Sequence, residues 1–294
     1  MTPPGDRSPP AGPQNPPGRP EPPDFDTVDG ILREAARTIV LPHFQNLAGA
    51  DVKTKTGPND FVTVADERCE AFLREALTGA LPGSTTIGEE AAAADPSVME
   101  RLGRPGDVWI IDPIDGTWNY AHDNPRFATI VALVRDGVTV RGYIHLPVRE
   151  ETYAAGLGQG AHGSSGALRM PAPAAFGAMT GALYVGKSRA PAMFERIKAL
   201  RNRGRLGPRR FARCAAWEYI AMLTGRAHYT VFTRLLPWDH AAGILMIAEA
   251  GGCYGYVDGS PHSGPWRPVE RDIPFLLAPD AASWRNIRDT LTED

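Results

Sequence analysis

The chain has 294 residues, of which 43% are hydrophobic and 22% charged, and its formal net charge is −3. This supports one large domain or two closely joined ones, and the near balance of charge gives no reason to expect nucleic acid or an anionic membrane as a partner. No apolar run approaches the roughly 18 residues that span a bilayer, and the N-terminus lacks the apolar core of a secretory signal. The three isolated cysteines fit neither a disulfide framework nor a structural zinc site, so we expect reduced thiols in a cytoplasmic protein.

Residues 1–24 form a proline-rich segment. Ten of the 28 prolines fall there and aliphatic residues are few, so the segment buries too little apolar area to offset the entropy of ordering it. We therefore expect a disordered tail. A proline-rich ligand for another protein stays an alternative, because PPGRPEPP is only a weak signal of one.

The next part of the chain predicts helices and then strands. Apolar residues recur at helical spacing from Val28 to Ile39, which indicates an amphipathic helix. Later runs rich in β-branched residues indicate strands, with Asp136-Gly137 as a hairpin turn. The expected helices are 26–47 and 65–81, and the expected strands are 85–88, 108–112 and two or more within 127–155.

A connection rich in glycine, proline and serine over 156–177 separates this part from a region of alternating strands and helices. Its expected strands are 182–186, 228–232, 253–257 and 274–278, and its expected helices are 191–201, 215–225, 239–250 and 279–291. Strand-rich and then alternating segments indicate layered sheets and helices, so we expect a mixed α/β (α+β) fold.

The segment WIIDPIDGT is the most informative stretch of the sequence. A buried strand brings Asp112 to its carboxyl end, and Pro113 should end the strand pairing there. Asp115 lies in the following turn, Gly116 allows close approach of the backbone to a ligand, and Thr117 is placed to cap a short helix. A helix start suits a phosphate. Two carboxylates beside an anion site need a cation, and oxygen ligands favour Mg²⁺ over zinc.

Other interpretations of this segment meet difficulties of spacing. An EF-hand loop needs acidic or amide ligands where Ile114 and Gly116 stand. A phosphoaspartyl enzyme needs carboxylates two residues apart instead of three, and a Walker loop is absent. Considered alone, however, the segment is also compatible with an ordinary acidic turn.

Three further segments bring acids to the ends of predicted elements. Glu89 follows a strand, Asp66 lies near a helix start, and Asp239 opens the helix over 239–250. Each has a plain alternative on its own: an exposed loop for Glu89, and a helix cap for Asp66 and Asp239.

Together, GEE, VTVAD, DPIDGT and WDHAAG resemble, in order and spacing, the inositol monophosphatase-like superfamily of metal-dependent phosphatases, over residues 26–292. The resemblance implies a layered αβαβα sandwich of the inositol monophosphatase and fructose-1,6-bisphosphatase type. It implies one phosphatase domain over 25–294, with a metal-site half over about 25–160 and a C-terminal α/β half over about 178–294. It also implies hydrolysis of a small-molecule phosphate monoester, activation by Mg²⁺, inhibition by Li⁺ and a homodimer.

The resemblance also assigns roles to residues. A first Mg²⁺ is expected on Glu89, Asp112 and the carbonyl of Ile114, and a second on Asp112, Asp115 and Asp239. Glu89 holds a third, weaker ion in this scheme. The pair Thr117 and Asp66 is expected to activate the attacking water, and the N–H groups of Gly116 and Thr117 are expected to bind the phosphoryl oxygens.

The substrate is less clear from the sequence. Lys55 is either a metal-loop residue or a solvated lysine. Phe232 stands where inositol-preferring members carry an acid, His228 stands at another usual aspartate, and Arg213-Cys214 replaces a small pair that lines the substrate pocket. Without those carboxylates, neither inositol phosphate nor an amine-bearing substrate is favoured. Phe232, His228 or Trp217 are candidates for stacking on a base.

Two alternatives remain open from the sequence. Seven lysines and arginines between Lys198 and Arg213 form either a solvated surface or a second phosphate subsite. A subsite favours a fructose-1,6-bisphosphatase or a 3′(2′),5′-bisphosphate nucleotidase. An inactive metal-binding or regulatory homologue is the alternative of another class, although every matched acid and Thr117 are present.

Overall fold

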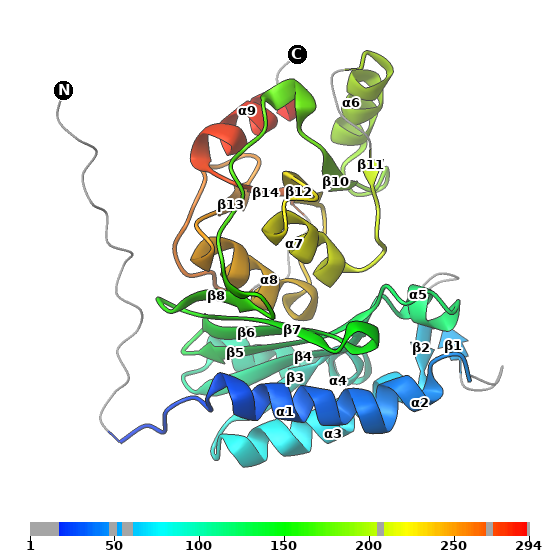
Figure 1. Cartoon of the computed structure of the whole chain (residues 1–294), viewed down its shortest axis with the longest axis vertical. Helices are drawn as coiled ribbons and strands as arrows, with labels where there is room; N and C mark the ends of the chain where they lie inside the picture. Colours follow the sequence, from blue (N-terminus) through cyan, green and yellow to red (C-terminus); the bar gives the residue numbers. More distant parts are fainter. Residues whose placement is uncertain (1–17, 47–51, 55–60, 205–208, 269–272, 293–294) are drawn as a thin grey trace.

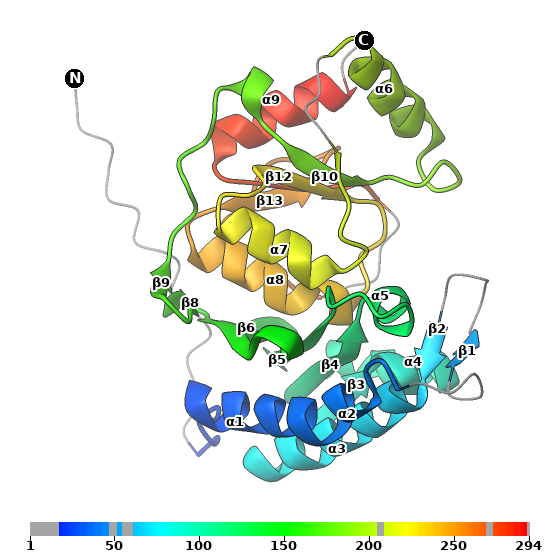
Figure 2. The same cartoon turned by 45° about the vertical axis from the view of Figure 1, so that its right-hand side comes forward.

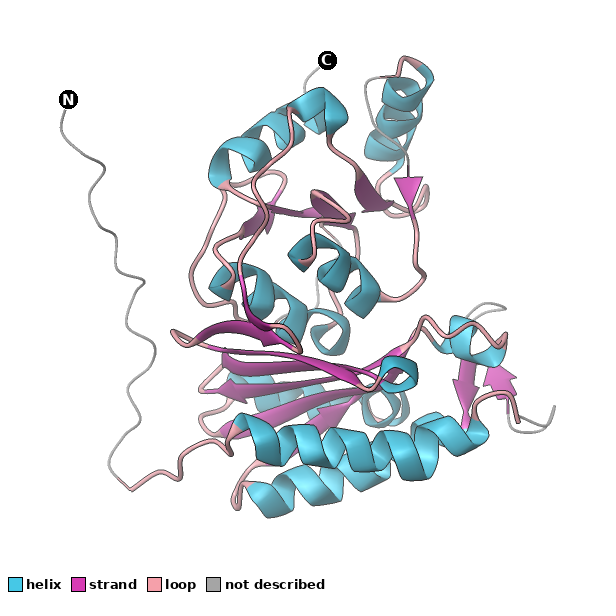
Figure 3. Ribbon diagram, viewed as in Figure 1, coloured by secondary structure: helices cyan, strands magenta, loops and turns pink. Residues whose placement is uncertain are grey.

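The computed structural model describes residues 18–46, 52–54, 61–204, 209–268 and 273–292. Five layers follow one another in the described part (Figure 1, Figure 3). Helices α1 and α3 cover one face of a seven-stranded sheet, α7 and α8 lie between this sheet and a five-stranded sheet, and α6 and α9 cover the far face of the second sheet. The predicted αβαβα arrangement is confirmed.

The seven-stranded sheet has the strand order β3-β4-β5-β6-β7-β8-β9, and all of its pairs are antiparallel except β3 with β4. Its strands are β3 (Thr85–Gly88), β4 (Asp107–Asp115), β5 (Ala128–Arg135), β6 (Val138–Leu146), β7 (Glu151–Gly156), β8 (Gly160–Gly163) and β9 (Gly166–Leu168). The sheet therefore runs through the glycine-rich stretch that was expected to be a connection, and beyond the expected boundary near residue 160.

The helices around this sheet begin with a continuous rod. It consists of α1 (Phe25–Ala35), the π-helical turn η1 (Ala36–Val40) and α2 (Leu41–His43). The other helical segments on this side are α3 (Val64–Ala80), α4 (Glu89–Ala94), η3 (Pro96–Gly103), α5 (Thr117–Ala121) and η4 (Pro147–Arg149). Apolar side chains of α1 and α3, such as Leu32 and Leu73, pack on Trp109 and other residues of the sheet. A separate strand pair joins β1 (Val52–Thr54) to β2 (Phe61–Thr63).

The five-stranded sheet has the order β11-β10-β12-β14-β13. Its strands are β10 (Gly181–Tyr184), β11 (Arg209–Arg210), β12 (Tyr229–Phe232), β13 (Cys253–Tyr256) and β14 (Phe275–Ala278), and its helical segments are η5 (Phe176–Ala178), α6 (Pro191–Asn202), α7 (Ala215–Leu223), α8 (Pro237–Glu249) and α9 (Ala281–Thr292). Figure 2 shows α7 and α8 as the layer shared by both sheets. One apolar cluster runs from β5 through α7 and α8 to Phe275 of β14, so the two halves share a core.

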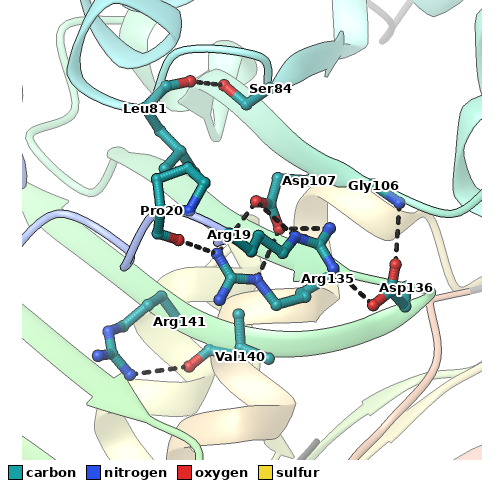
Figure 4. A network of polar contacts seen from close by, with 10 residues as sticks. All are labelled: Arg19, Pro20, Leu81, Ser84, Gly106, Asp107, Arg135, Asp136, Val140 and Arg141. Carbon is teal, nitrogen blue, oxygen red and sulfur yellow. Dashed lines mark hydrogen bonds and ion pairs between the residues drawn. The ribbon is translucent and has the colours of Figure 1, made fainter. Parts of the chain in front are cut away.

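The last residues of the proline-rich segment are placed against the sheet. The Arg19 guanidinium binds Asp107 (3.1 Å) and Asp136 (2.6 Å), while Arg135 pairs with Asp107 (2.8 Å) and donates to the carbonyl of Pro20 (2.9 Å) (Figure 4). The expected disorder therefore does not extend through residues 18–24. Residues 1–17 lie outside the described part of the chain.

Among the described residues, no helix is both long enough and apolar enough to pass through a lipid bilayer.

Candidate active site

Strand β4 carries both aspartates of the DPIDGT segment at its C-terminal end. The sequence predicted that strand pairing ends at Pro113, but β4 remains paired with β5 beyond this residue. The pairing shifts register between Asp112 and Asp115 and resumes with Asp115 opposite Ala128. Because the register shifts at this point, the sheet needs no N–H donor from Pro113. The carbonyl of Pro113 accepts from the hydroxyl of Thr129 (2.9 Å). The bulge allows Asp112 and Asp115 to lie in one region although they are three residues apart.

Asp112 is a fully buried acid of the site. Its side chain is 1% exposed, and its Oδ1 atom has no hydrogen-bond partner among the described residues. Burial first, and then the charges of Glu89, Asp115 and Asp239, raise the pKa of Asp112 well above its usual range. A buried carboxylate surrounded by acids is costly unless a cation or a proton compensates it.

Glu89 is brought beside Asp112 by the parallel pairing of β3 with β4, in which Gly88 lies opposite Ile111. The next turn is held by Glu70 of α3, whose carboxylate accepts from the backbone N–H of Glu90 (2.8 Å) and of Ala91 (3.0 Å). A Cβ at Gly88 would lie 2.1 Å from the Glu70 carboxyl carbon. Glu70 thus caps α4 from a distance and fixes Glu89, and no sequence motif pointed to it.

Asp115 lies at the N-terminus of α7. Its Oδ1 accepts from the N–H of Ala215 (3.0 Å), and its Oδ2 accepts from the N–H of Ala216 (2.6 Å) and the thiol of Cys214 (3.0 Å). Burial raises the pKa of Asp115, while these donors act in the opposite direction. Oδ1 accepts only one of these hydrogen bonds and keeps a second lone pair, so Asp115 remains able to ligate a cation.

Asp66 and Thr117 meet as the sequence suggested. Thr63 donates to Oδ2 of Asp66 through its N–H (2.8 Å) and its hydroxyl (2.6 Å), which forms a capping box at the start of α3. This leaves Oδ1 of Asp66 to face the Thr117 hydroxyl at 3.5 Å. Burial raises the pKa of Asp66 to about 8. Asp66 is therefore both a helix-capping residue and a neighbour of Thr117.

The turn between β4 and α5 differs from the sequence expectation in one detail. Gly116, with φ of 89°, is the residue that precedes the helix, and Thr117 is its first helical residue instead of its cap. The Thr117 hydroxyl donates to the carbonyl of Ile114 (3.0 Å). A side chain at Gly116 would press on Cys214 and on the carbonyl of Arg213 (3.1 and 3.3 Å), so glycine is required for both conformation and space.

Asp239 is the third residue of α8, not its cap, which is Leu236. Burial and the charges of Asp115 and Glu89 raise the pKa of Asp239 well above its usual range, while a hydrogen bond with Asp112 acts against this. Helix α8 packs against β4, β5 and β6, and this packing delivers an acid from the C-terminal half to the acids of the first half.

A cavity of about 480 Å³ opens beside Asp115 and Asp239. Its wall includes Arg213, Cys214 and Phe232, which were predicted as pocket residues. Phe232 is buried in a column of rings with Tyr184 (5.3 Å between centroids) and His240 (4.5 Å). His228 does not line this cavity; it accepts from the N–H of Thr180 (3.1 Å) at the start of β12. Lys55 lies outside the described residues.

Two buried polar residues that the sequence did not single out hold the cavity loop over residues 211–214. Asn119, 1% exposed, donates to the carbonyls of Arg126 (2.6 Å) and Ala212 (2.8 Å). Glu218 accepts from the hydroxyl of Tyr184 and the N–H of Ala212, both at 2.7 Å. The contact of Asn119 with Ala212 joins residues 93 apart and that of Glu218 with Tyr184 joins residues 34 apart, so the fold is needed to reveal both.

The donor set fits a hard cation. Asp112, Asp115, Asp239 and Glu89 offer only oxygen, and the unpartnered Oδ1 of Asp112 is a buried acceptor without a donor in the described part of the chain. Among the described residues, no three acidic, histidine or cysteine side chains already stand close enough to hold an ion.

Comparison with known proteins agrees with this chemistry. The model of the inositol monophosphatase family matches residues 24–285. The chain is 31% identical to the inositol-1-monophosphatase of Bacillus subtilis, over 78% of this chain and 84% of that protein. It is 30% identical to a fructose-1,6-bisphosphatase/inositol-1-monophosphatase of Thermotoga maritima, over 69% and 73%.

The fold gives the same result. The solved structure of an IMPase from Thermotoga maritima superimposes with a TM-score of 0.74 at 25% identity, over 92% of this chain and 96% of that one. The extent of the family match and these identities together establish the relationship. The chain belongs to the inositol monophosphatase family and is a metal-dependent phosphatase that hydrolyses phosphate monoesters.

Proposed function

We propose that the chain hydrolyses a small phosphate monoester with two to three Mg²⁺ ions bound by Glu89, Asp112, Asp115, Asp239 and the carbonyl of Ile114. The observation that carries this proposal is the buried, unpartnered Oδ1 of Asp112 among three other acids. Carboxylate and carbonyl oxygens are the ligands that Mg²⁺ prefers. When bound, Mg²⁺ supplies positive charge that lowers the pKa of a water molecule and neutralises the phosphoryl oxygens.

Thr117 and Asp66 are proposed to position the attacking water and to take its proton. The capping box fixes the Asp66 carboxylate through Oδ2 and leaves Oδ1 towards the Thr117 hydroxyl. The hydroxyl donates to Ile114 in this structure and has Oδ1 of Asp66 as its second acceptor. Once it donates to Asp66, its oxygen lone pairs accept a hydrogen bond from water.

Gly116 and Thr117 are proposed to hold the phosphoryl group through their backbone N–H groups. The left-handed Gly116 allows the turn to present these groups at the start of α5. Glu70 and Asp115 hold the neighbouring helices α4 and α7 in place, because their carboxylates accept hydrogen bonds from backbone N–H groups at the starts of these helices. Catalysis would then consist mainly of positioning and charge neutralisation.

The experiment is an assay of phosphate release from inositol 1-phosphate, fructose 1,6-bisphosphate, adenosine 3′,5′-bisphosphate, histidinol phosphate and p-nitrophenyl phosphate. Each substrate is tested with Mg²⁺, with EDTA, and with EDTA followed by excess Mg²⁺. We expect turnover of at least one substrate with Mg²⁺, loss with EDTA and recovery with Mg²⁺. Turnover that EDTA leaves intact, or none with any substrate, contradicts the proposal.

We also propose a cytoplasmic, Li⁺-sensitive homodimer. All three cysteines are buried and unpaired, which suits a reducing compartment.

The exposed large hydrophobic residues Val148 and Phe211 both line a hollow of about 520 Å³, as expected for a surface that a second copy covers. Light scattering should give twice the chain mass, and a monomer for Val148→Asp. A monomeric wild-type protein contradicts the dimer, and activity unchanged by millimolar Li⁺ contradicts the inhibition.

A further inference from the structure

Arg213 has an unusual backbone conformation at the wall of the active-site cavity. Its φ is 56°, in the left-handed region that favours glycine. Neighbouring contacts impose this conformation: the N–H of Arg213 donates to the hydroxyl of Tyr184 (3.1 Å), and the carbonyl of Ala212 accepts from Asn119 (2.8 Å). A bulky residue held in this region at an active site points to a role for its side chain.

The guanidinium of Arg213 is stacked but carries no polar partner. It lies 3.9 Å from the ring centre of Trp118 and 5.7 Å from that of Phe211. Within the described part of the chain it makes no hydrogen bond and no ion pair. Stacking uses the faces of the guanidinium plane, whereas its N–H groups point outwards in that plane. Its donors are therefore available to a ligand.

The cavity around Arg213 is basic on the side away from the metal acids. Asp115 and Asp239 are the acids of its wall, and both belong to the proposed metal site, whereas Arg189 and Arg234 line it together with Arg213. If these two acids bind metal ions, the other charged side chains that line the cavity are all arginines.

The rest of the basic stretch does not contribute to this wall. Lys198 and Arg201 line a different, smaller cavity beside α6, and Arg203 ends α6 without lining any described cavity. Of the described side chains in the stretch over 198–213, only Phe211 and Arg213 reach the active-site cavity. Among the described side chains of this stretch, Arg213 is thus the basic one that a substrate at the metal site would meet.

From these observations we propose that Arg213 selects substrates whose leaving group carries a second phosphate. The in-plane N–H groups of the guanidinium bind two oxygens of that phosphate, while Trp118 holds the guanidinium plane in place. The inference rests on the proposed function, and it adds to that function the substrate class and the residue that recognises it. It also accounts for an arginine at a backbone position that glycine would occupy more easily.

The test measures kcat/KM with Mg²⁺ for two matched pairs: fructose 1,6-bisphosphate with fructose 1-phosphate, and adenosine 3′,5′-bisphosphate with adenosine 3′-monophosphate. Each pair gives a ratio of bisphosphate to monophosphate. The variants are Arg213→Gly, which suits the left-handed backbone and should fold, and Arg213→Lys, which keeps charge without a planar fork. Arg203→Gly makes the same change on the exposed end of α6 and is the matched control.

We expect the wild-type ratio to exceed one in at least one pair. In that pair Arg213→Gly lowers it about tenfold, mainly through KM, Arg213→Lys gives an intermediate value, and Arg203→Gly leaves it unchanged. The unfolding midpoint of Arg213→Gly should not fall. A ratio that changes less than twofold in Arg213→Gly, or that Arg203→Gly lowers equally, overturns the inference. So does a wild-type ratio of one or below in both pairs. Hydrolysis of the monophosphates, or of inositol 1-phosphate, histidinol phosphate or p-nitrophenyl phosphate, in that case leaves the proposed function standing. No hydrolysis of any of these compounds or of the bisphosphates overturns both.

Discussion

The two ends of the active-site cavity are built in different ways. At the phosphoryl end, two of the acids are fixed by backbone or hydroxyl donors: Asp115 by α7 and Asp66 by Thr63. At the leaving-group end, rings and arginines form the wall, and the Arg213 guanidinium keeps its donors unused within the described chain. The first arrangement leaves little freedom in geometry or charge, whereas the second tolerates side chains of different chemistry. We therefore infer that the reaction is set at one end and the choice of substrate at the other.

Replacing Asp112 by Asn should have the largest effect, because it removes a proposed bridging ligand at the fixed end. We expect kcat/KM to fall by roughly 10³-fold or more, about 4 kcal/mol in transition-state stabilisation. In EDTA the variant should unfold at a higher temperature than the wild type, since a buried carboxylate among acids is removed. Phosphate-release kinetics and thermal unfolding measure the two effects.

Asp123→Asn is the matched control for this change. Asp123 is exposed on the loop after α5, and its left-handed backbone suits asparagine. It should alter neither activity nor stability. Full Mg²⁺-dependent activity in Asp112→Asn would remove Asp112 from the ligand set.

The stability of the fold should respond to acid through His145, which does not line the cavity. Burial, with Arg33 nearby, lowers the pKa of His145 from its ordinary 6.5 to about 4. His145 therefore binds a proton near pH 6.5 in the unfolded chain but only near pH 4 in the folded chain. The free energy of unfolding falls as the pH falls between these values. The loss is up to about 3 kcal/mol.

Urea unfolding at pH 7.5 and pH 4.5, for the wild type and His145→Gln, measures this contribution. Glutamine has no proton to gain and retains a group able to hydrogen-bond to the hydroxyl of Thr152, which lies 2.8 Å from His145 Nδ1. The pH dependence should be smaller in the variant by most of this amount. An identical dependence in both proteins assigns the acid response to other groups.

Asn119→Ala should sharpen the comparison, because Asn119 ties the fixed turn to the loop that carries Arg213. Two partly buried carbonyls, of Arg126 and Ala212, lose their donor, which should cost about 1–2 kcal/mol in unfolding free energy. Asn286→Ala, on the exposed face of α9, is the control with little expected effect. KM for the preferred substrate should rise more than kcat falls. A fall in kcat alone would show that Asn119 serves the phosphoryl end only.

Arg19→Ala should have the smallest effect. It removes an ion pair with Asp107 and Asp136 but leaves the buried Asp107–Arg135 pair in place, so the expected loss is about 1 kcal/mol of unfolding free energy without change in kcat/KM. Arg37→Ala, which breaks the exposed pair with Glu34, should cost less. Equal effects would mean that the attachment of residues 18–24 contributes no more than an ordinary surface pair.

The sequence was sufficient for elements with a clear period and for acids at their ends. The strand 85–88 and the acids Glu89, Asp112, Asp115 and Asp239 were located from pattern and motif. β8 and β9 were missed because their glycine-rich sequences show little alternation of apolar residues.

The supporting residues were missed for a different reason. Glu70 resembles any helical carboxylate, and its role exists only because α3 passes the start of α4. The left-handed backbone of Arg213 is likewise imposed by Tyr184 and Asn119, which lie in other elements. Such roles depend on long-range contacts that a single sequence does not contain, and the same holds for the placement of His228 outside the cavity.

The central claim is that Asp112 and its neighbouring acids hold the ions on which hydrolysis depends. Anomalous diffraction from crystals of the full chain soaked in Mn²⁺, an oxygen-preferring ion that substitutes for Mg²⁺, tests it most directly. We predict anomalous peaks at coordination distance from Asp112, with further ligands among Glu89, Asp115, Asp239 and the carbonyl of Ile114. A protein that hydrolyses its substrate with Mn²⁺ but shows no peak at Asp112 would contradict the account.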